Sequence, residues 1–448
     1  MNSYGNDWRN YSLIGRLIGS LATWGESSWL LRRSQLLGAI LIALLLSLAP
    51  FVSTSTLGII LLGIGCLWLL LTLTEEQKFS SGWIDKLVLL YWAIATVATA
   101  FSPVKSAAID GWIKLTLYLM FFALCARVLR SPHLRNLLIT LLLHISVIVS
   151  VYGVRQKIFG APQLATWNDP TSPLANKTRV YSYLENPNLL AGYLLGAIAL
   201  SLGAIFIWRG WLRKSLAVTF FVVNSACLYF TDSRGGWLAL VGLLGTFSFL
   251  LYYRYYQYLP KFWRYWLIPL VIGAIAVIGV IAFWRVETLR LRILSIFVGR
   301  ADSSNNFRLN VWDAVLEMIR DYPIIGIGPG NKAFQQIYPL YMRPKFTSLG
   351  AYSIYLEMTV EMGLIGISCF LALVGITFYR GITNLQRLIK ADNVEGFWLI
   401  SAMSGLAGLL IQGIADVIWY RPQVNTLWWF LVALIASFDY TVRGSREM

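Results

Sequence analysis

Arginines beside acidic or amide residues are the side chains of this sequence best suited to chemistry. A guanidinium binds phosphate, carboxylate or bicarbonate through two parallel hydrogen bonds. Arg234 stands between two apolar runs, in the segment Thr231-Asp232-Ser233-Arg234-Gly235-Gly236. An arginine within a membrane costs about 2.5–3.5 kcal/mol on insertion scales, so it is normally paired or functional. We expect Arg234, with Ser233, to bind an anion, and an ion pair with Asp232 is the structural alternative.

A second candidate segment, Glu185-Asn186-Pro187-Asn188, precedes the sixth apolar run. Its proline breaks the approach, and Asn188 can cap the following helix. Capping does not explain Glu185 and Asn186, which we keep as supporting residues of a site. Arg179 lies just upstream in a polar stretch and is a further candidate for anion binding.

The longest polar stretch, 285–352, holds nine Lys or Arg against five Asp or Glu. This excess predicts an anionic ligand for Arg308, although long loops also cross membranes regardless of charge. Apolar residues at helical spacing predict an amphipathic helix that packs on the bundle: Leu309, Trp312, Val315, Leu316 and Ile319. The glycine-rich Gly326–Asn331 segment lacks the strand and spacing of a phosphate-binding loop, which favours a structural turn over a ligand cradle.

Glu357 and Glu361 open the apolar run that follows. They are four residues apart and share one helical face. Arg308 is a candidate partner, and a structural ion pair is the favoured interpretation of Glu361. The two histidines are far apart and the four cysteines lie in apolar runs without a CxxC pair, so the sequence predicts no metal site and no cofactor.

The scaffold for these residues follows from composition. Hydrophobic residues make up 57% of the 448 and charged residues 13%, against about 45–50% and 25% in soluble domains. The sequence therefore predicts an all-α, polytopic integral membrane protein of about twelve transmembrane helices with a large periplasmic loop. The expected spans are 36–51, 55–73, 87–101, 112–128, 137–154, 189–208, 215–231, 236–253, 265–284, 353–379, 396–418 and 424–438.

Charge between the spans predicts their orientation. Lys and Arg concentrate on alternate loops, so the positive-inside rule places both termini in the cytoplasm. The net charge of +16 thus serves topology and contact with membrane lipids rather than nucleic acid. The expected organisation is a cytoplasmic segment 1–35, helices one to nine over 36–284, the outer loop 285–352, helices ten to twelve over 353–438 and a cytoplasmic tail 439–448. Residues 1–35 fit a helix on the membrane surface or a poorly ordered tail equally well.

Taken in order, these motifs resemble the O-antigen ligase and polymerase superfamily of bacterial membrane proteins. The matching positions are Asn-Pro-Asn at 186–188, Ser-Arg-Gly at 233–235, Arg308 through 323–331, and Tyr355, Leu356, Glu361, Gly363 and Gly366. Such proteins transfer undecaprenyl-diphosphate-linked glycans without a metal or nucleotide cofactor. The resemblance implies a bacterial inner membrane, and it implies that basic residues hold the lipid diphosphate.

The chain departs from that family at the end of the outer loop. The family's His-Asn pair is Tyr352-Ser353 here. A phenol with a pKa near 10 does not accept a proton at neutral pH, so Glu185 or Glu357 would have to act as the base. Whether the protein is an enzyme stays open. The stretch 350–357 looks like the cyanobacterial inorganic-carbon transporter B (IctB) family, named for bicarbonate transport.

Three hypotheses follow. The leading one is an inner-membrane protein of bicarbonate accumulation, in which Arg234, Arg308 and Arg179 bind the anion. This hypothesis includes a direct bicarbonate carrier. The alternative is a transferase of polyprenyl-diphosphate-linked glycans that uses the same arginines. The third is a non-catalytic descendant of that family that binds a polyprenyl lipid or a partner protein.

Overall fold

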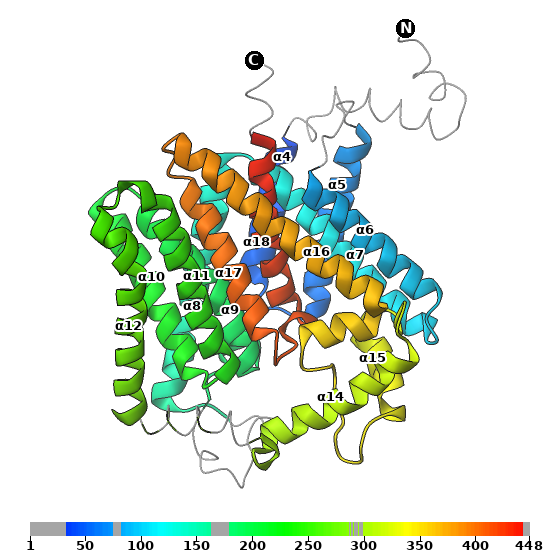
Figure 1. Ribbon diagram of the computed structural model, residues 1–448. Helices are drawn as coiled ribbons and strands as arrows, with labels where there is room; N and C mark the ends of the chain where they lie inside the picture. The colour runs from blue at the N-terminus through cyan, green and yellow to red at the C-terminus, as the bar shows by residue number, and fades with distance from the viewer. Residues whose placement is uncertain are drawn as a thin grey trace, which may run out of the picture.

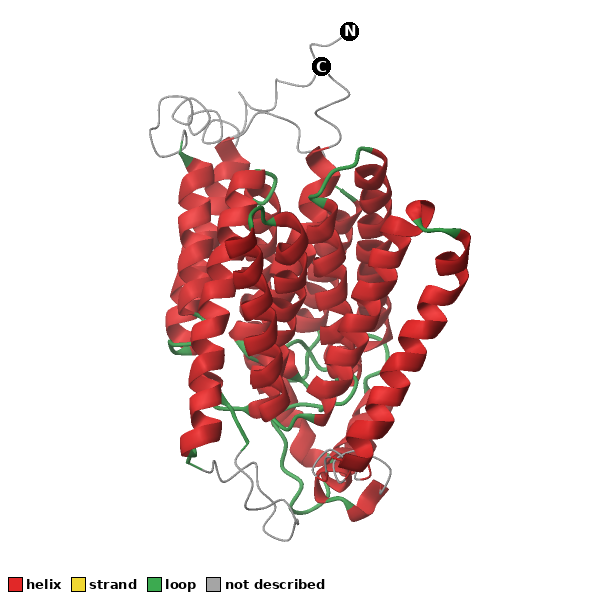
Figure 2. Ribbon diagram, turned by 90° about the vertical axis from the view of Figure 1, so that its left-hand side faces the viewer, coloured by secondary structure: helices red, strands yellow, loops and turns green. Residues whose placement is uncertain are grey.

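The computed structural model describes residues 33–74, 82–162, 179–285 and 299–441, with single positions 287, 290 and 294 between the last two ranges. The regular elements of these residues are helices. Figures 1 and 2 show a bundle of long helices with α14 and α15 at one end. Most of the expected segment 1–35 and of the tail 439–448 lies outside the described residues, so their predictions stay predictions.

Each expected apolar segment overlaps a helix, although 36–51 and 396–418 run several residues past the ends of theirs. These helices are α4 (Ser34–Leu48), α5 (Thr54–Thr74), α6 (Trp83–Ala100), α7 (Lys105–Val128), α8 (Pro132–Phe159), α9 (Pro187–Ile207), α10 (Trp211–Phe230), α11 (Arg234–Tyr255), α12 (Lys261–Arg285), α16 (Ile354–Lys390), α17 (Gly396–Gln412) and α18 (Pro422–Thr441). Seven of the described helices are long and apolar enough to cross a membrane, and α4 and α17 are shorter apolar helices. The protein is thus a polytopic helical membrane protein, because a helix satisfies its own backbone in lipid. The count of twelve spans stays a prediction.

Helix α9 forms the centre of the bundle, with 78% of its most apolar window buried. It packs against α17, α10 and α18. Small residues permit this approach: a Cβ at Gly203 would lie 2.2 Å from Ser401 Oγ, and one at Gly196 would lie 2.6 Å from Leu427 Cδ2. Close packing through small residues is the usual basis of helix association in membranes. It gives the segment before α9 and the segment after α17 a rigid support.

Helix α16 is broken at Gly363, whose φ of 66° and ψ of −170° are not helical. The segment before α15 (Asn331–Ile337) fills the break: Ile327 N–H donates to Val360 O at 2.9 Å, and Leu364 N–H donates to Pro323 O at 2.8 Å. The Gly326–Asn331 segment therefore satisfies backbone groups of α16, as its structural interpretation predicts. The helix also continues to Lys390, eleven residues past the expected end at 379.

The predicted amphipathic helix is α14 (Ser303–Asp321), but part of its predicted stripe is wrong. Its buried residues are Asn310, Val311, Ala314, Val315 and Met318, while Leu316 is 47% exposed. The buried face packs against Phe334, Ile337 and Tyr338 of the α15 region. The 285–352 loop thus has a small hydrophobic core of its own, which the spacing of apolar residues in the sequence does not reveal.

Helix α17 ends at Gln412 and does not run to residue 418 as expected. Gly413 ends it, and the carbonyl of Gly413 accepts from Ile354 N–H at 2.8 Å. The start of α16 is thereby tied to the end of α17. The chain then passes through Asp416 into a single 3₁₀ turn, η5 (Ile418–Tyr420), before α18 begins.

Candidate functional site

The turn before α9 fixes the first part of the site. Asn186 caps the helix, because its Oδ1 accepts from Asn188 N–H at 2.8 Å and from Leu189 N–H at 3.3 Å. The sequence assigned the cap to Asn188, so that detail is corrected. The Asn188 side chain is left to face the site. Glu185 has a left-handed φ of 59° and is exposed.

Arg179 lies across this turn. Its Nε donates to Thr231 O and its Nη2 donates to Asn188 Oδ1, each at 3.1 Å. The segment before α9 and the end of α10 are joined by this one guanidinium. Gln412 of α17 supports the same turn by donating from Nε2 to Asn188 O at 2.8 Å. Arg179 is therefore held in place before any ligand binds, which lowers the entropy lost on binding.

Arg308 reaches the same region from α14. Its Nε donates to Ala415 O at 2.9 Å, its Nη1 donates to Ser304 Oγ at 2.6 Å, and its guanidinium lies 5.8 Å from the centre of the Tyr352 ring. The side chain is half-buried. The contact with Ala415 places Arg308 beside the connection between α17 and α18.

Asp416 lies near enough to both arginines for their charges to act on its carboxyl, and it was not among the site residues predicted from the sequence. Burial raises the pKa of the Asp416 carboxyl, while the charges of Arg308 and Arg179 and a hydrogen bond from Asn188 oppose that rise. Burial and the charge of Asp416 raise the pKa of Tyr352 to about 12. A lone carboxylate at the edge of an apolar run was the signal that could have found it, because such residues are rarely there without a function.

Tyr420 of η5 completes the wall beside Asp416. Burial raises the pKa of its phenol, which has hydrogen bonds with Arg421 and Asn186. The site thus combines two guanidiniums, one carboxyl, one amide and two phenols. They come from the segment before α9 and its first turn, from α14, from the end of the loop before α16 and from the segment between α17 and α18.

Arg234 pairs with an acidic residue at the start of α14. Its Nη2 pairs with Asp302 Oδ1 at 3.1 Å, and Asp302 caps α14 by accepting from Asn305 N–H at 2.9 Å. Ser233 caps α11, its Oγ accepting from Gly236 N–H at 3.1 Å. The structure therefore places Ser233 and Arg234 where they hold α11 and the beginning of α14, the helix that carries Arg308.

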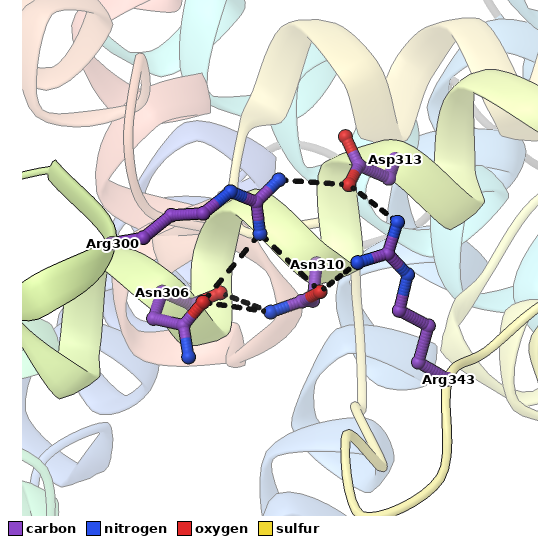
Figure 3. A network of polar contacts seen from close by, with 5 residues as sticks. All are labelled: Arg300, Asn306, Asn310, Asp313 and Arg343. Carbon is purple, nitrogen blue, oxygen red and sulfur yellow. Dashed lines mark hydrogen bonds and ion pairs between the residues drawn. The ribbon is translucent and has the colours of Figure 1, made fainter.

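A polar network fixes the other side of α14 (Figure 3). Arg300 Nη2 and Arg343 Nη2 lie 3.0 Å and 3.4 Å from the same Asp313 oxygen. Arg343 Nη1 also donates to Asn310 Oδ1 at 3.0 Å. These contacts join α14 to the segments on both sides of it, so the direction of Arg308 is set by two independent anchors.

Glu357 and Glu361 are both buried and lie on the first turns of α16. The Glu357 Oε2 accepts from Ala351 N–H, and its Oε1 has no hydrogen-bond partner among the described residues. Glu361 accepts from Gly330 N–H. The favoured ion pair of Glu361 is wrong for the part of the chain that the structure describes, because no Lys or Arg there pairs with it.

The two glutamates line a cavity of about 110 Å³. Aromatic residues form much of its wall: Tyr91, Tyr118, Phe370, Trp419, Tyr420 and Trp429. Tyr420 is therefore shared between this cavity and the Asp416 site. The described residues contain no group of three or more His, Cys, Asp or Glu that could hold a metal ion.

Comparison with known protein families gives a match to part of the chain. The family model described as O-antigen ligase matches residues 219–371, and no curated protein matches the chain. This stretch is therefore similar to the O-antigen ligase family. It includes Ser233, Arg234, Arg308 and Tyr352, whereas Arg179 and Asp416 lie outside it. The match supports the predicted superfamily and does not reach the inorganic-carbon family, which stays a prediction.

Proposed function

We propose that this protein transfers a glycan from a polyprenyl diphosphate to an acceptor hydroxyl at the end of the bundle that carries α14. Arg179 and Arg308 bind the diphosphate, and Asp416 accepts the acceptor's proton. The observation that carries the proposal is the position of one half-buried carboxyl, Asp416, directly after the Ala415 carbonyl that Arg308 binds and in hydrogen-bond contact with Asn188, which Arg179 binds. The similarity to the O-antigen ligase family supports a lipid-linked glycan as the substrate class.

The proposed reaction is a single substitution. The acceptor oxygen attacks the anomeric carbon, the bond from that carbon to the diphosphate breaks, and the hydroxyl proton passes to Asp416. The diphosphate leaves with the electron pair and needs no proton, because the guanidiniums stabilise its charge. Removal of the proton by a positioned base contributes typically 10²–10⁴-fold to such a rate.

Substrate binding would also prepare the base. Arg308 and Arg179 both lower the pKa of Asp416 in the free protein. A bound diphosphate shares these positive charges and adds negative charge nearby, so the pKa of Asp416 rises and the carboxylate becomes a stronger base. The site is then most basic when the donor is in place.

The bases suggested by the sequence are less suitable. Glu357 already accepts a backbone hydrogen bond from Ala351 and faces the aromatic cavity. Glu185 is exposed at a turn. Tyr352, with a pKa of about 12, keeps its proton at neutral pH and can only donate a hydrogen bond.

A reconstituted transfer assay tests the proposal. Purified protein is incubated with a polyprenyl-diphosphate oligosaccharide and a lipid-linked sugar acceptor, and the product is followed by mass spectrometry. We expect Asp416→Asn to lower the rate by roughly 100-fold or more. Glu317→Gln, an exposed carboxylate of α14, is the matched control and should keep the wild-type rate. Equal rates in the two variants would remove Asp416 from the mechanism.

The bicarbonate hypothesis calls for a separate assay on the same preparation. Labelled bicarbonate uptake into proteoliposomes that equals uptake by empty liposomes would exclude a direct carrier. If neither uptake nor transfer is measured while a polyprenyl diphosphate binds, a non-catalytic lipid-binding role is left. The three predicted functions are thus separated by measuring transfer, uptake and lipid binding.

We also place α14 and α15 on the outer side of a bacterial inner membrane, as the positive-inside rule predicts. Glu317→Cys in a cysteine-free background tests this orientation. A maleimide that cannot cross membranes should label it in intact spheroplasts. Labelling only after the membrane is opened would reverse the topology and exclude an external donor site.

A further inference from the structure

A second cavity is lined by residues where α10 begins and α11 ends. Figure 1 shows these helix ends at the end of the bundle away from α14. The volume of the cavity is about 280 Å³. Charged and aromatic side chains line it: Lys214, Arg254, Asp392, Tyr255, Tyr258 and Phe397. None of these residues belongs to the proposed transfer site.

Arg254, in the last turn of α11, is the unusual member. Its side chain is only 6% exposed, and its Nη1 has no hydrogen-bond partner among the described residues. The guanidinium stacks 4.6 Å from the centre of the Phe397 ring. Its ion pair with Asp392 spans 4.0 Å, and the Asp392 side chain is 94% exposed.

Two other arginines of this part of the bundle with low exposure each have a carboxylate in direct contact. Arg135 Nη1 lies 2.5 Å from Glu395 Oε2, and Arg380 Nη2 lies 2.8 Å from Asp439 Oδ1. Arg254 has no such carboxylate at hydrogen-bond distance within the described ranges. An arginine stays ionised in proteins, so a buried one needs an anion in contact to offset its desolvation.

We propose that this cavity binds a phosphate group, supplied by the headgroup of an anionic phospholipid. Arg254 offers the planar fork that fits phosphate oxygens, and Lys214 at the start of α10 offers a second charge. The cavity lies between helix ends flanked by exposed aromatic residues such as Trp211 and Tyr258, which is the composition of a membrane–water interface. Basic pockets between helices at that level suit lipid headgroups.

Free phosphate has the same chemistry as the headgroup, so the test must separate the two sources. Purified full-length protein is stripped of lipid, and binding is measured by native mass spectrometry. The probes are phosphatidylglycerol, phosphatidylcholine and inorganic phosphate. A headgroup site favours phosphatidylglycerol, because Arg254 and Lys214 repel the choline cation. Saturation by inorganic phosphate alone, with no preference between the lipids, would assign the cavity to a soluble phosphate instead.

Variants decide whether this cavity is the site. Lys214→Gln should weaken phosphatidylglycerol binding by roughly tenfold, the usual effect of losing one charged hydrogen bond. Arg213→Gln is the matched control, because Arg213 is equally exposed one residue away and does not line the cavity. Equal weakening by both variants, or by neither, would overturn the proposal.

Two further substitutions change charged residues that line the cavity. Arg254→Lys keeps the charge, loses the planar fork, and should reduce binding by a similar factor. Asp392→Asn should instead tighten binding, because it removes the only described carboxylate lining the cavity. Asparagine tolerates the left-handed φ of 45° at this position, so this variant should fold normally. Unchanged binding in Asp392→Asn together with Arg254→Lys would refute the assignment.

Discussion

Two groups of acidic side chains share Tyr420 at the end of the bundle that carries α14, and they differ in what surrounds them. Asp416 faces the guanidiniums of Arg308 and Arg179. Glu357 and Glu361 face aromatic rings and backbone amides. The same functional group is therefore charge-compensated in one region and desolvated in the other.

This difference indicates which region handles a substrate anion. Two arginines and one carboxylate give the Asp416 site a net positive charge, which suits an anionic ligand. The described lining of the glutamate cavity contains no arginine, and its lysine, Lys114, already pairs with Asp110 at 2.6 Å, so an anion there would face two carboxyls with little compensating charge. Glu357 and Glu361 instead bind the backbone of Ala351 and Gly330, which fixes the loop before α16.

The largest expected effect comes from removing a guanidinium from the first region. Arg308→Gln should lower kcat/KM for glycan transfer by roughly 100-fold, because the departing diphosphate loses a charged, bidentate contact. Arg320→Gln, an exposed arginine on the same helix, is the control for a change in net charge. A rate within about threefold of that control would mean that the diphosphate binds elsewhere.

The next effect is on pH dependence and concerns the same carboxyl. Asp416 must be ionised to accept a proton, so activity should fall about tenfold per pH unit below its pKa. Burial raises that pKa, so the acid limb of kcat/KM should lie above the range of an exposed aspartate. Bound diphosphate raises it further, and the limb of kcat should lie at still higher pH. The residual activity of Asp416→Asn should show no such acid limb. An acid limb that persists in this variant would belong to another group.

The comparison also predicts opposite effects of one chemical change on stability. Asp416→Asn leaves two guanidiniums without their carboxylate and should destabilise the fold by about 1–2 kcal/mol, since the site is half-buried. Glu357→Gln keeps the acceptor for Ala351 N–H and removes a desolvated charge, so it should be neutral or slightly stabilising. Thermal unfolding in detergent measures both. A loss of equal size in both variants would mean that the two carboxyls have equivalent surroundings.

The sequence predicts the scaffold better than the site, and α17 shows why. Apolar runs specify helices in lipid, so each expected segment overlaps a helix. The end of α17 depends on Gly413 meeting Ile354, a contact between residues 59 positions apart that periodicity cannot reveal. The expected span to 418 consequently hid Asp416, the residue whose carboxyl the charges of Arg308 and Arg179 affect. The prediction that Leu316 lies on the buried face of α14 is wrong for a related reason. That face is set by packing against the α15 region, which the sequence spacing does not show.

The smallest expected effect tests whether Tyr352 took over the chemistry of the histidine that the resemblance implies. Its pKa of about 12 keeps the phenol neutral, and its ring lies beside Arg308. Tyr352→Phe retains the ring and should reduce transfer by no more than about threefold, the loss of one neutral hydrogen bond. Tyr352→His is the complementary variant and should not rescue Asp416→Asn, because the proton acceptor lies near the arginines. Rescue would instead place the base at the end of the outer loop. Glu357 and Glu361, on the other side of Tyr420, would then have to be reconsidered as parts of the mechanism.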